Sequence, residues 1–113
     1  MRAAPVPDGD LATQRTAVEA FLAAARDGDL EGLLAVLDPD VELHAQTRGG
    51  RRHLRGAAGA AEQAPRFAGR VGHARPVLVD GAAGVVVEPG GTRVAVLAFT
   101  VAGGRIRHLV IWT

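Results

Sequence analysis

The sequence predicts one α+β domain, in which three helices from the N-terminal half pack on a curved antiparallel sheet. Up to about residue 37, apolar residues recur at the three- and four-residue spacing of amphipathic helices. After residue 72, Val-rich runs alternate with turn residues, which is typical of short strands. A further helical segment lies between one early strand and these later ones. Helices followed mainly by strands favour an α+β protein over a βαβ protein.

Two helices open the domain. Residues 10–26 predict the first helix, because their apolar positions fall on one face and Asp27-Gly28 then stops the pattern. Asp29 is a suitable N-cap for a second, short helix whose leucines form one stripe until Asp38-Pro39. The two helices should therefore form a hairpin.

A strand and a third helix follow. Apolar residues alternate with polar ones over residues 41–46, which predicts a strand with one buried face. An Arg- and Gly-rich loop is expected next. The Ala-rich residues 56–67 predict a third helix, but Gly59 and Pro65 should keep it short or kinked.

Four more strands complete the predicted sheet. Val-rich runs cover residues 75–80, 85–88, 92–101 and 105–112, and Gly- or Pro-containing turns separate them. Short turns join antiparallel neighbours, so the sequence predicts a meander.

Length and charge restrict the possible partners. The chain has 113 residues and a formal net charge of +1, and it lacks the run of about 18 apolar residues that a membrane span needs. We expect residues 1–10 to form a flexible arm and residues 11–113 a single domain. The arm lacks the apolar core of a secretory signal, so a cytoplasmic protein is expected, with no membrane and no nucleic acid as partner.

Missing residue types exclude several chemistries. The sequence contains no Ser, Cys, Lys, Tyr or Asn. Serine and cysteine nucleophiles, Schiff-base lysines, disulfides and thiolate metal sites are therefore impossible. Catalysis would have to use Asp, Glu, His, Arg, Thr, Gln or the single Trp.

The order of motifs resembles a known fold. An amphipathic helix, Asp-Gly-Asp-Leu (27–30), Asp-Pro-Asp-Val (38–41), one strand, Arg-Gly-Ala (55–57) opening a helix and then a meander are similar to the cone-shaped fold of ketosteroid isomerase, nuclear transport factor and the SnoaL-like polyketide cyclases. Residues 74–81 and 94–106 most resemble the SnoaL-like domain appended to certain extracytoplasmic-function sigma factors. The chain begins with Met1 and has no room for a sigma factor's promoter- and polymerase-binding helices, so we expect a free-standing relative or the appended domain alone.

The resemblance also implies which positions would carry catalytic residues. In ketosteroid isomerase a carboxylate base, a Tyr and a protonated Asp work inside an apolar cone. The matching positions here hold Ala45, Phe21 and Leu97, or Val96 if the turn is counted differently, so steroid-type isomerisation is excluded. The water-activating carboxylates of limonene-epoxide hydrolases are not expected either. A SnoaL-style cyclase needs less, chiefly an acid or base and a cavity that folds the substrate.

His44 is the candidate catalytic residue, because imidazole titrates near neutrality and His44 is next to the family's base position. Strict alternation would instead direct it away from the cone, unless a bulge follows Ala45. Gln63 either faces the cone or lies exposed beside Glu62. The residues expected to line the ligand site are Phe21, Leu43, Ala45, Gln63, Phe67, Leu97, Phe99 and Trp112, the last of which also suits a core or interface position.

The remaining basic residues are not expected to form a metal or nucleic-acid site. Arg48, Arg51, Arg52, His53 and Arg55 lack interleaved aromatics, so we interpret them as a solvated loop at the rim, with one Arg able to hold a ligand carboxylate. His53, His73 and His108 are far apart in sequence and show no metal-ligand spacing. No metal and no cofactor are predicted.

A homodimer and two functional hypotheses complete the prediction. The strand over residues 92–101 is apolar on both faces, so its outer face should be covered by a second copy. The leading hypothesis is a protein that binds an apolar small molecule in the cone, as a cyclase or isomerase of a polyketide-like secondary metabolite. The alternative is a non-catalytic module that senses a ligand or contacts a protein partner, as in the sigma factors.

Overall fold

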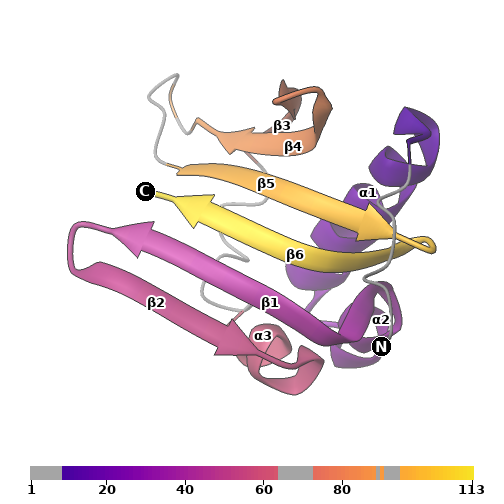
Figure 1. The fold of residues 1–113 in the computed structure, drawn as a ribbon, viewed down its shortest axis with the longest axis horizontal. Helices are drawn as coiled ribbons and strands as arrows, with labels where there is room; N and C mark the ends of the chain where they lie inside the picture. Colours follow the sequence, from indigo (N-terminus) through magenta and orange to yellow (C-terminus); the bar gives the residue numbers. More distant parts are fainter. Residues whose placement is uncertain (1–8, 64–72, 89, 91–94) are drawn as a thin grey trace, which may run out of the picture.

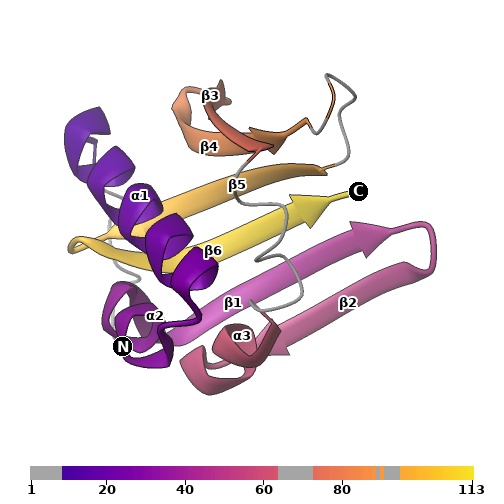
Figure 2. The same cartoon turned by 180° about the vertical axis from the view of Figure 1, so that it is seen from behind.

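The computed structural model describes residues 9–63, 73–88, 90 and 95–113. Three helices lie on one side of a curved sheet, and no helix of the described residues covers the other side (Figures 1 and 2). The predicted α+β class is therefore confirmed. Most of the expected N-terminal arm, residues 1–8, lies outside the described residues.

The sheet has six strands in the order β2-β1-β6-β5-β4-β3. Their bounds are β1 Leu37–Thr47, β2 Gly50–Arg55, β3 Ala74–Val79, β4 Ala82–Val87, β5 Ala95–Ala102 and β6 Arg105–Trp112. The four late strands form the predicted antiparallel meander. β6 then pairs with β1 in parallel, so the sheet as a whole is mixed, because the last strand runs in the same direction as the first.

β1 begins four residues and β4 three residues earlier than predicted, and one strand was not predicted at all. Residues 50–55 form β2 and not a loop, and they make an antiparallel hairpin with β1 across the turn at Arg48-Gly49. Gly50 has a φ of 118°, a conformation that glycine adopts without steric cost. The sequence pattern concealed this edge strand because it carries Arg and His at most positions and only Leu54 as an apolar residue.

Local chemistry fixes the ends of the first two helices. The Asp10 side chain caps α1, Leu11–Asp27, and Gly28 ends that helix in the left-handed conformation at φ 66°. The Asp29 carboxylate accepts a hydrogen bond from the Gly32 backbone N–H and so caps α2, Leu30–Val36. α3 covers Ala57–Gln63, and the predicted continuation to residue 67 lies outside the described residues.

The core lies between the helices and the face of the sheet that they cover, called the inner face below. Phe21 of α1 meets Phe99 of β5 edge to face, with ring centroids 5.6 Å apart. Gln14, which is buried on α1, accepts a hydrogen bond from the Ala83 backbone N–H at 2.8 Å and thereby joins α1 to β4. Among the described residues, no helix is both long and apolar enough to cross a membrane.

Candidate ligand-binding site

Two rows of side chains cross the inner face of the sheet. Strand pairing places Arg52, Ala45, Ile111, Leu97 and Val85 side by side in the first row. Residues opposite one another on neighbouring strands project to the same face, so these side chains share one surface. Four of the five are hydrocarbon.

The second row is entirely apolar. It consists of Leu54, Leu43, Leu109 and Phe99, one from each of β2, β1, β6 and β5. Leu43, Leu109 and Phe99 are buried in the core, and Leu54 packs against its edge. Together the two rows form an apolar layer of the core, with a single charged side chain at one end.

The positions that the resemblance to ketosteroid isomerase implied as catalytic hold hydrocarbon side chains, two of them on the sheet and Phe21 on α1. Phe21 and Leu97 are buried, and Ala45 is packed against the core. None of them binds or releases a proton. The inner face therefore offers no acid or base at these positions.

His44 lies on the opposite face of the sheet, called the outer face below. Its pairing with His53 on β2 and Val110 on β6 belongs to an unbroken register that runs from Glu42 to Gln46. The shift in the β1–β6 ladder lies earlier, between Leu37 and Glu42, so no bulge after Ala45 turns His44 inward. The alternation of the strand is kept, and His44 is directed away from the core.

Arg52 is the charged residue of the first row. It pairs with Ala45, whereas its neighbour Arg51 pairs with Gln46 and Arg55 pairs with Glu42. Alternation along β2 therefore directs Arg52 to the inner face and both Arg51 and Arg55 to the outer face. The expectation that one Arg of this cluster holds a ligand carboxylate now has a specific candidate.

For three of the residues expected to line the ligand site, the structure does not show a side chain on the inner face. Trp112 is 39% exposed and pairs with Val96 and Gln46, which places it on the outer face. Its position suits a protein contact and not the inner surface. Gln63 is the last residue of α3, but its side chain, like the whole of Phe67, lies outside the described residues.

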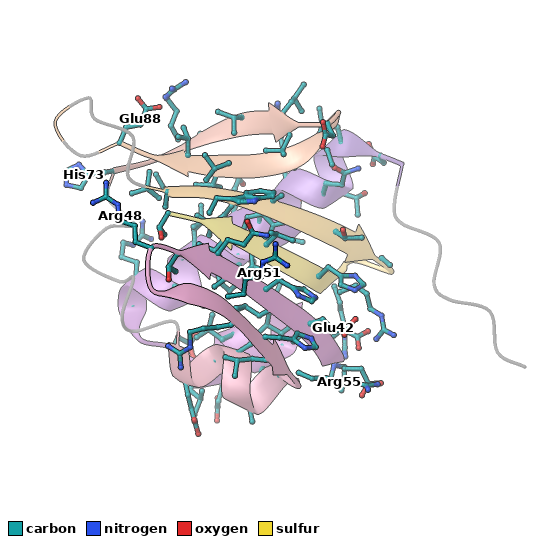
Figure 3. All side chains as sticks on the ribbon, turned by 60° about the vertical axis from the view of Figure 1, so that its left-hand side comes forward. Glu42, Arg48, Arg51, Arg55, His73 and Glu88 are labelled. Carbon is teal, nitrogen blue, oxygen red and sulfur yellow. The ribbon has the colours of Figure 1, made fainter. Side chains whose placement is uncertain are left out.

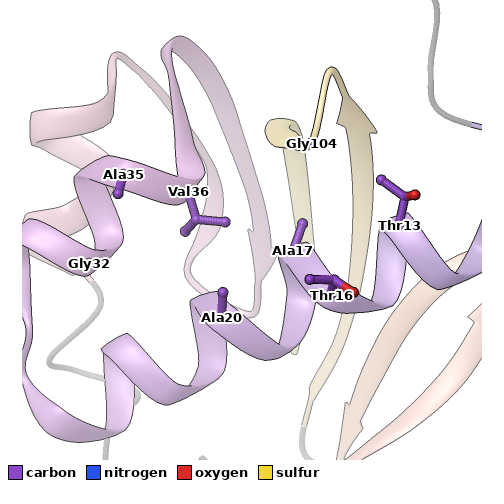
Figure 4. Close-up of a pocket in the computed structure, with 8 residues that line it drawn as sticks. All are labelled: Thr13, Thr16, Ala17, Ala20, Gly32, Ala35, Val36 and Gly104. Carbon is purple, nitrogen blue, oxygen red and sulfur yellow. The ribbon is translucent and has the colours of Figure 1, made fainter.

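A surface groove of about 400 Å³ lies between α1, α2 and the turn before β6 (Figure 4). Its lining residues are Thr13, Thr16, Ala17, Ala20, Gly32, Ala35, Val36 and Gly104. The Thr13 hydroxyl donates to Asp10, and the Thr16 hydroxyl donates to the Ala12 carbonyl oxygen. Both hydroxyl protons are thus used within the helix, and the groove presents no titratable side chain among its lining residues.

The outer face contains a cluster that sequence spacing did not predict. The Glu42 carboxylate lies 3.3 Å from His53 Nε2 and 2.9 Å from His108 Nε2. The hydrogen bond from His108 lowers the pKa of Glu42 below its usual value, against the opposing effect of partial burial. These histidines are distant in sequence, and the β1–β2 and β1–β6 ladders bring them together. The sequence signal that could have indicated this cluster is Glu42-x-His44, because these two polar residues lie on one face of one strand.

No protein-family model and no curated protein sequence matches the chain. Solved structures do match. Over 89% of its length the chain is similar to the extracytoplasmic function sigma factor SigJ of Mycobacterium tuberculosis, with a TM-score of 0.72 and 22% identity. The chain spans 42% of the length of that sigma factor.

Two further structures share the fold over most of both chains. An epoxide hydrolase of M. tuberculosis, described as similar to limonene-epoxide hydrolase, has 25% identity and a TM-score of 0.58, and the match covers 90% of this chain and 83% of that one. A candidate polyketide cyclase from Xanthomonas campestris has 19% identity and a TM-score of 0.60, with 91% of each chain covered. The chain therefore has the nuclear-transport-factor-like, or SnoaL-like, fold.

Proposed function

We propose that this protein binds a largely apolar small molecule carrying an acidic or carbonyl oxygen, on the inner face of its sheet. The observation that carries the proposal is the first inner-face row, in which hydrocarbon side chains lead to one arginine. Apolar area supplies most of the affinity of such a site, and one well-placed polar group orients the ligand. A guanidinium suits this role because it binds carboxylates through two parallel hydrogen bonds.

In the proposed role the protein binds its ligand, and no side chain on the strands acts as a base. The three positions discussed above hold Phe21, Ala45 and Leu97, and His44 belongs to the outer face. A cyclase or isomerase of a polyketide-like metabolite would then have to act by holding its substrate in the folded conformation. Likeness to a candidate polyketide cyclase keeps this reaction among the outcomes to be tested.

The binding proposal is tested with 8-anilinonaphthalene-1-sulfonate, an apolar anion whose fluorescence increases in apolar surroundings. Arg52→Gln should weaken its binding, whereas Arg51→Gln, one residue away on the other face, should leave it unchanged. Circular dichroism checks that both variants unfold at the wild-type temperature. Equal effects of the two substitutions, or no effect of either, would contradict the proposal.

Mass spectrometry of small molecules that co-purify with the protein identifies the natural ligand. We expect an apolar molecule with an acidic or carbonyl oxygen, released unchanged after incubation with the protein. Recovery of an isomerised or cyclised product would show turnover and would support the enzymatic alternative. A protein that binds no small molecule would contradict both.

A regulatory module is the second candidate function. The supporting observation is the similarity to SigJ, which has the highest TM-score of the three structures described above. In this role, ligand binding on the inner face would alter a contact with a protein partner. Binding without turnover, together with a sigma factor encoded beside this gene, would favour this candidate.

We further propose a homodimer through the outer face of β4, β5 and β6. Trp112 and Val110 lie on this face, and Val96 and Ala98 of β5 pair with them. Light scattering at micromolar concentration should give twice the monomer mass for the wild type and the monomer mass for Trp112→Glu. A monomeric wild type would contradict the dimer.

A further inference from the structure

Glu42, His44, His53 and His108 converge on the outer face of the sheet, and they are called the histidine cluster below. They come from β1, β2 and β6, and they include three of the four histidines in the chain. Figure 3 shows the outer face with Glu42, Arg51 and Arg55 labelled. The cluster is on the opposite side of the sheet from the proposed ligand site, and it borders the proposed dimer face at Val110, the β6 partner of His44.

The backbone brings these side chains together. Glu42 and His44 are two residues apart on β1 and therefore project from the same face. His53 is the direct partner of His44 in the β1–β2 ladder, and His108 is the partner of Glu42 in the β1–β6 ladder. The arrangement follows from strand register and does not depend on a loop.

Three of the four groups have the separation and chemistry of metal ligands. One ligand atom from each of Glu42, His44 and His53 lies within 4.8 Å of the other two. Around a Zn²⁺ ion, with bonds of about 2.1 Å, tetrahedral ligand atoms are about 3.4 Å apart. Small side-chain rotations would therefore close the site.

The imidazoles of His44 and His53 are stacked, with ring centroids 4.3 Å apart and an angle of 9° between the planes. Binding one ion requires the rings to turn until a nitrogen of each is directed at it. Rotation of the imidazole about χ2 is inexpensive because this torsion has broad minima. The side chains of Glu42 and His53 are 35% and 50% exposed, so an ion can reach them from solvent.

We propose that the histidine cluster is a site for a divalent transition-metal ion, represented by Zn²⁺, with Glu42, His44 and His53 as ligands and His108 as a positioning residue. Two imidazoles and one carboxylate suit Zn²⁺, Cu²⁺ or Ni²⁺, whereas Mg²⁺ and Ca²⁺ prefer oxygen ligands throughout. Three protein ligands leave a further coordination position for water or an external group.

His108 acts through Glu42. Its Nε2–H donates to Glu42 Oε2 at 2.9 Å, while Glu42 Oε1 is directed toward His53. Holding one carboxylate oxygen in this way orients the other toward the ion, and loss of such an outer contact typically weakens metal binding by about 10- to 100-fold. His108→Gln keeps a donor and should bind Zn²⁺ more tightly than His108→Ala.

Zn²⁺ titration by calorimetry, with protein free of any affinity tag, tests the site. The wild type should bind one equivalent, and His44→Ala or His53→Ala should weaken binding by at least about tenfold. His73→Ala is the matched control, since His73 lies outside the cluster and should leave binding unchanged. The proposal is overturned if the wild type shows no saturable binding, or if His73→Ala weakens it as much as the cluster variants do.

Two further measurements keep the test independent of folding. Zn²⁺ should raise the unfolding temperature of the wild type and of His73→Ala by more than that of His53→Ala, because only the folded state presents the site and the weaker site stabilises it less. Arg55→Gln should tighten binding by removing a positive charge opposite Glu42. Mg²⁺ should produce none of these effects, and equal stabilisation by Mg²⁺ would contradict the nitrogen-rich site.

Discussion

Leu43 and His44 are neighbours on β1, yet they belong to two chemically different surfaces. Leu43 lies in the core between the sheet and the helices, whereas His44 stacks on His53 on the outer face. The same comparison holds on β2, where Arg52 is directed inward and Arg51 outward. In this sheet, the titratable cluster belongs to the outer face and the apolar rows to the inner face.

This difference explains why the fold alone does not indicate an activity. In ketosteroid isomerase the proton-handling groups are inside the cone, whereas the positions that the resemblance implied as their counterparts are apolar here. The cluster that has metal-binding chemistry is on the other face. A change of one residue in strand register would exchange the two surfaces, so the register is the critical structural fact.

The largest expected effect compares adjacent residues of β6. Leu109 is 2% exposed in the core, and Leu109→Ala should lower the free energy of unfolding by about 3 kcal/mol through lost burial and a cavity. Val110 is on the outer face, and Val110→Ala should cost less than about 1 kcal/mol. Urea unfolding measures both, and similar losses would show that the two faces are equally buried.

A smaller effect is expected where two strands approach closely. A Cβ on Gly84 of β4 would lie 2.7 Å from the Leu97 carbonyl oxygen and 2.7 Å from Val79 Cγ2. Gly84→Ala should therefore destabilise the protein by about 1 to 3 kcal/mol. Gly59→Ala in α3, where a Cβ meets nothing within 4 Å, should stabilise it by up to about 1 kcal/mol. Thermal unfolding checks the opposite signs, and a stabilising Gly84→Ala would refute the close approach.

The smallest expected effect is the change in stability at acidic pH, because neither inner-face row contains a carboxylate that would titrate there. At the start of α1, a hydrogen bond from the Thr13 hydroxyl lowers the pKa of Asp10 from its ordinary value, with help from the Ala12 N–H. A lowered pKa means that this contribution to stability is present above the unfolded-state pKa and is lost as pH falls through the folded-state pKa.

Asp10→Asn can still cap the helix but does not titrate in this range. The variant should therefore lose stability less steeply than the wild type below about pH 4, near the unfolded-state value. Unfolding temperatures measured from pH 6 to pH 2 provide the comparison. Parallel curves for the two proteins would contradict the assignment.

Sequence patterns predicted the helices and the late strands well, because their signals are local. The caps at Asp29 and Gly28 and the alternation around Leu43 can be read directly along the chain. The parallel pairing of β1 with β6 is a long-range contact, and edge strand β2 has a largely polar pattern, so neither was predicted. The histidine cluster depends on both of these pairings.

The sequence predicted the residue types of the candidate ligand site better than it predicted their arrangement in space. The sequence showed that Phe21, Ala45 and Leu97 stand at the positions that the resemblance implied as catalytic, and none of these side chains is an acid or base. Selecting Arg52 from a group of five basic residues required the β1–β2 register. The β1–β6 register assigned Trp112 and His44 to the outer face.

Methyl NMR tests the central claim most directly, because it reports on both faces in one experiment. On addition of 8-anilinonaphthalene-1-sulfonate, we expect shifts at the inner-face methyl groups of Leu43, Leu97 and Ile111 and none at the outer-face methyl groups of Val96 and Val110. Shifts confined to the two valines, with the inner-face signals unchanged, would contradict the claim that the inner face binds the ligand.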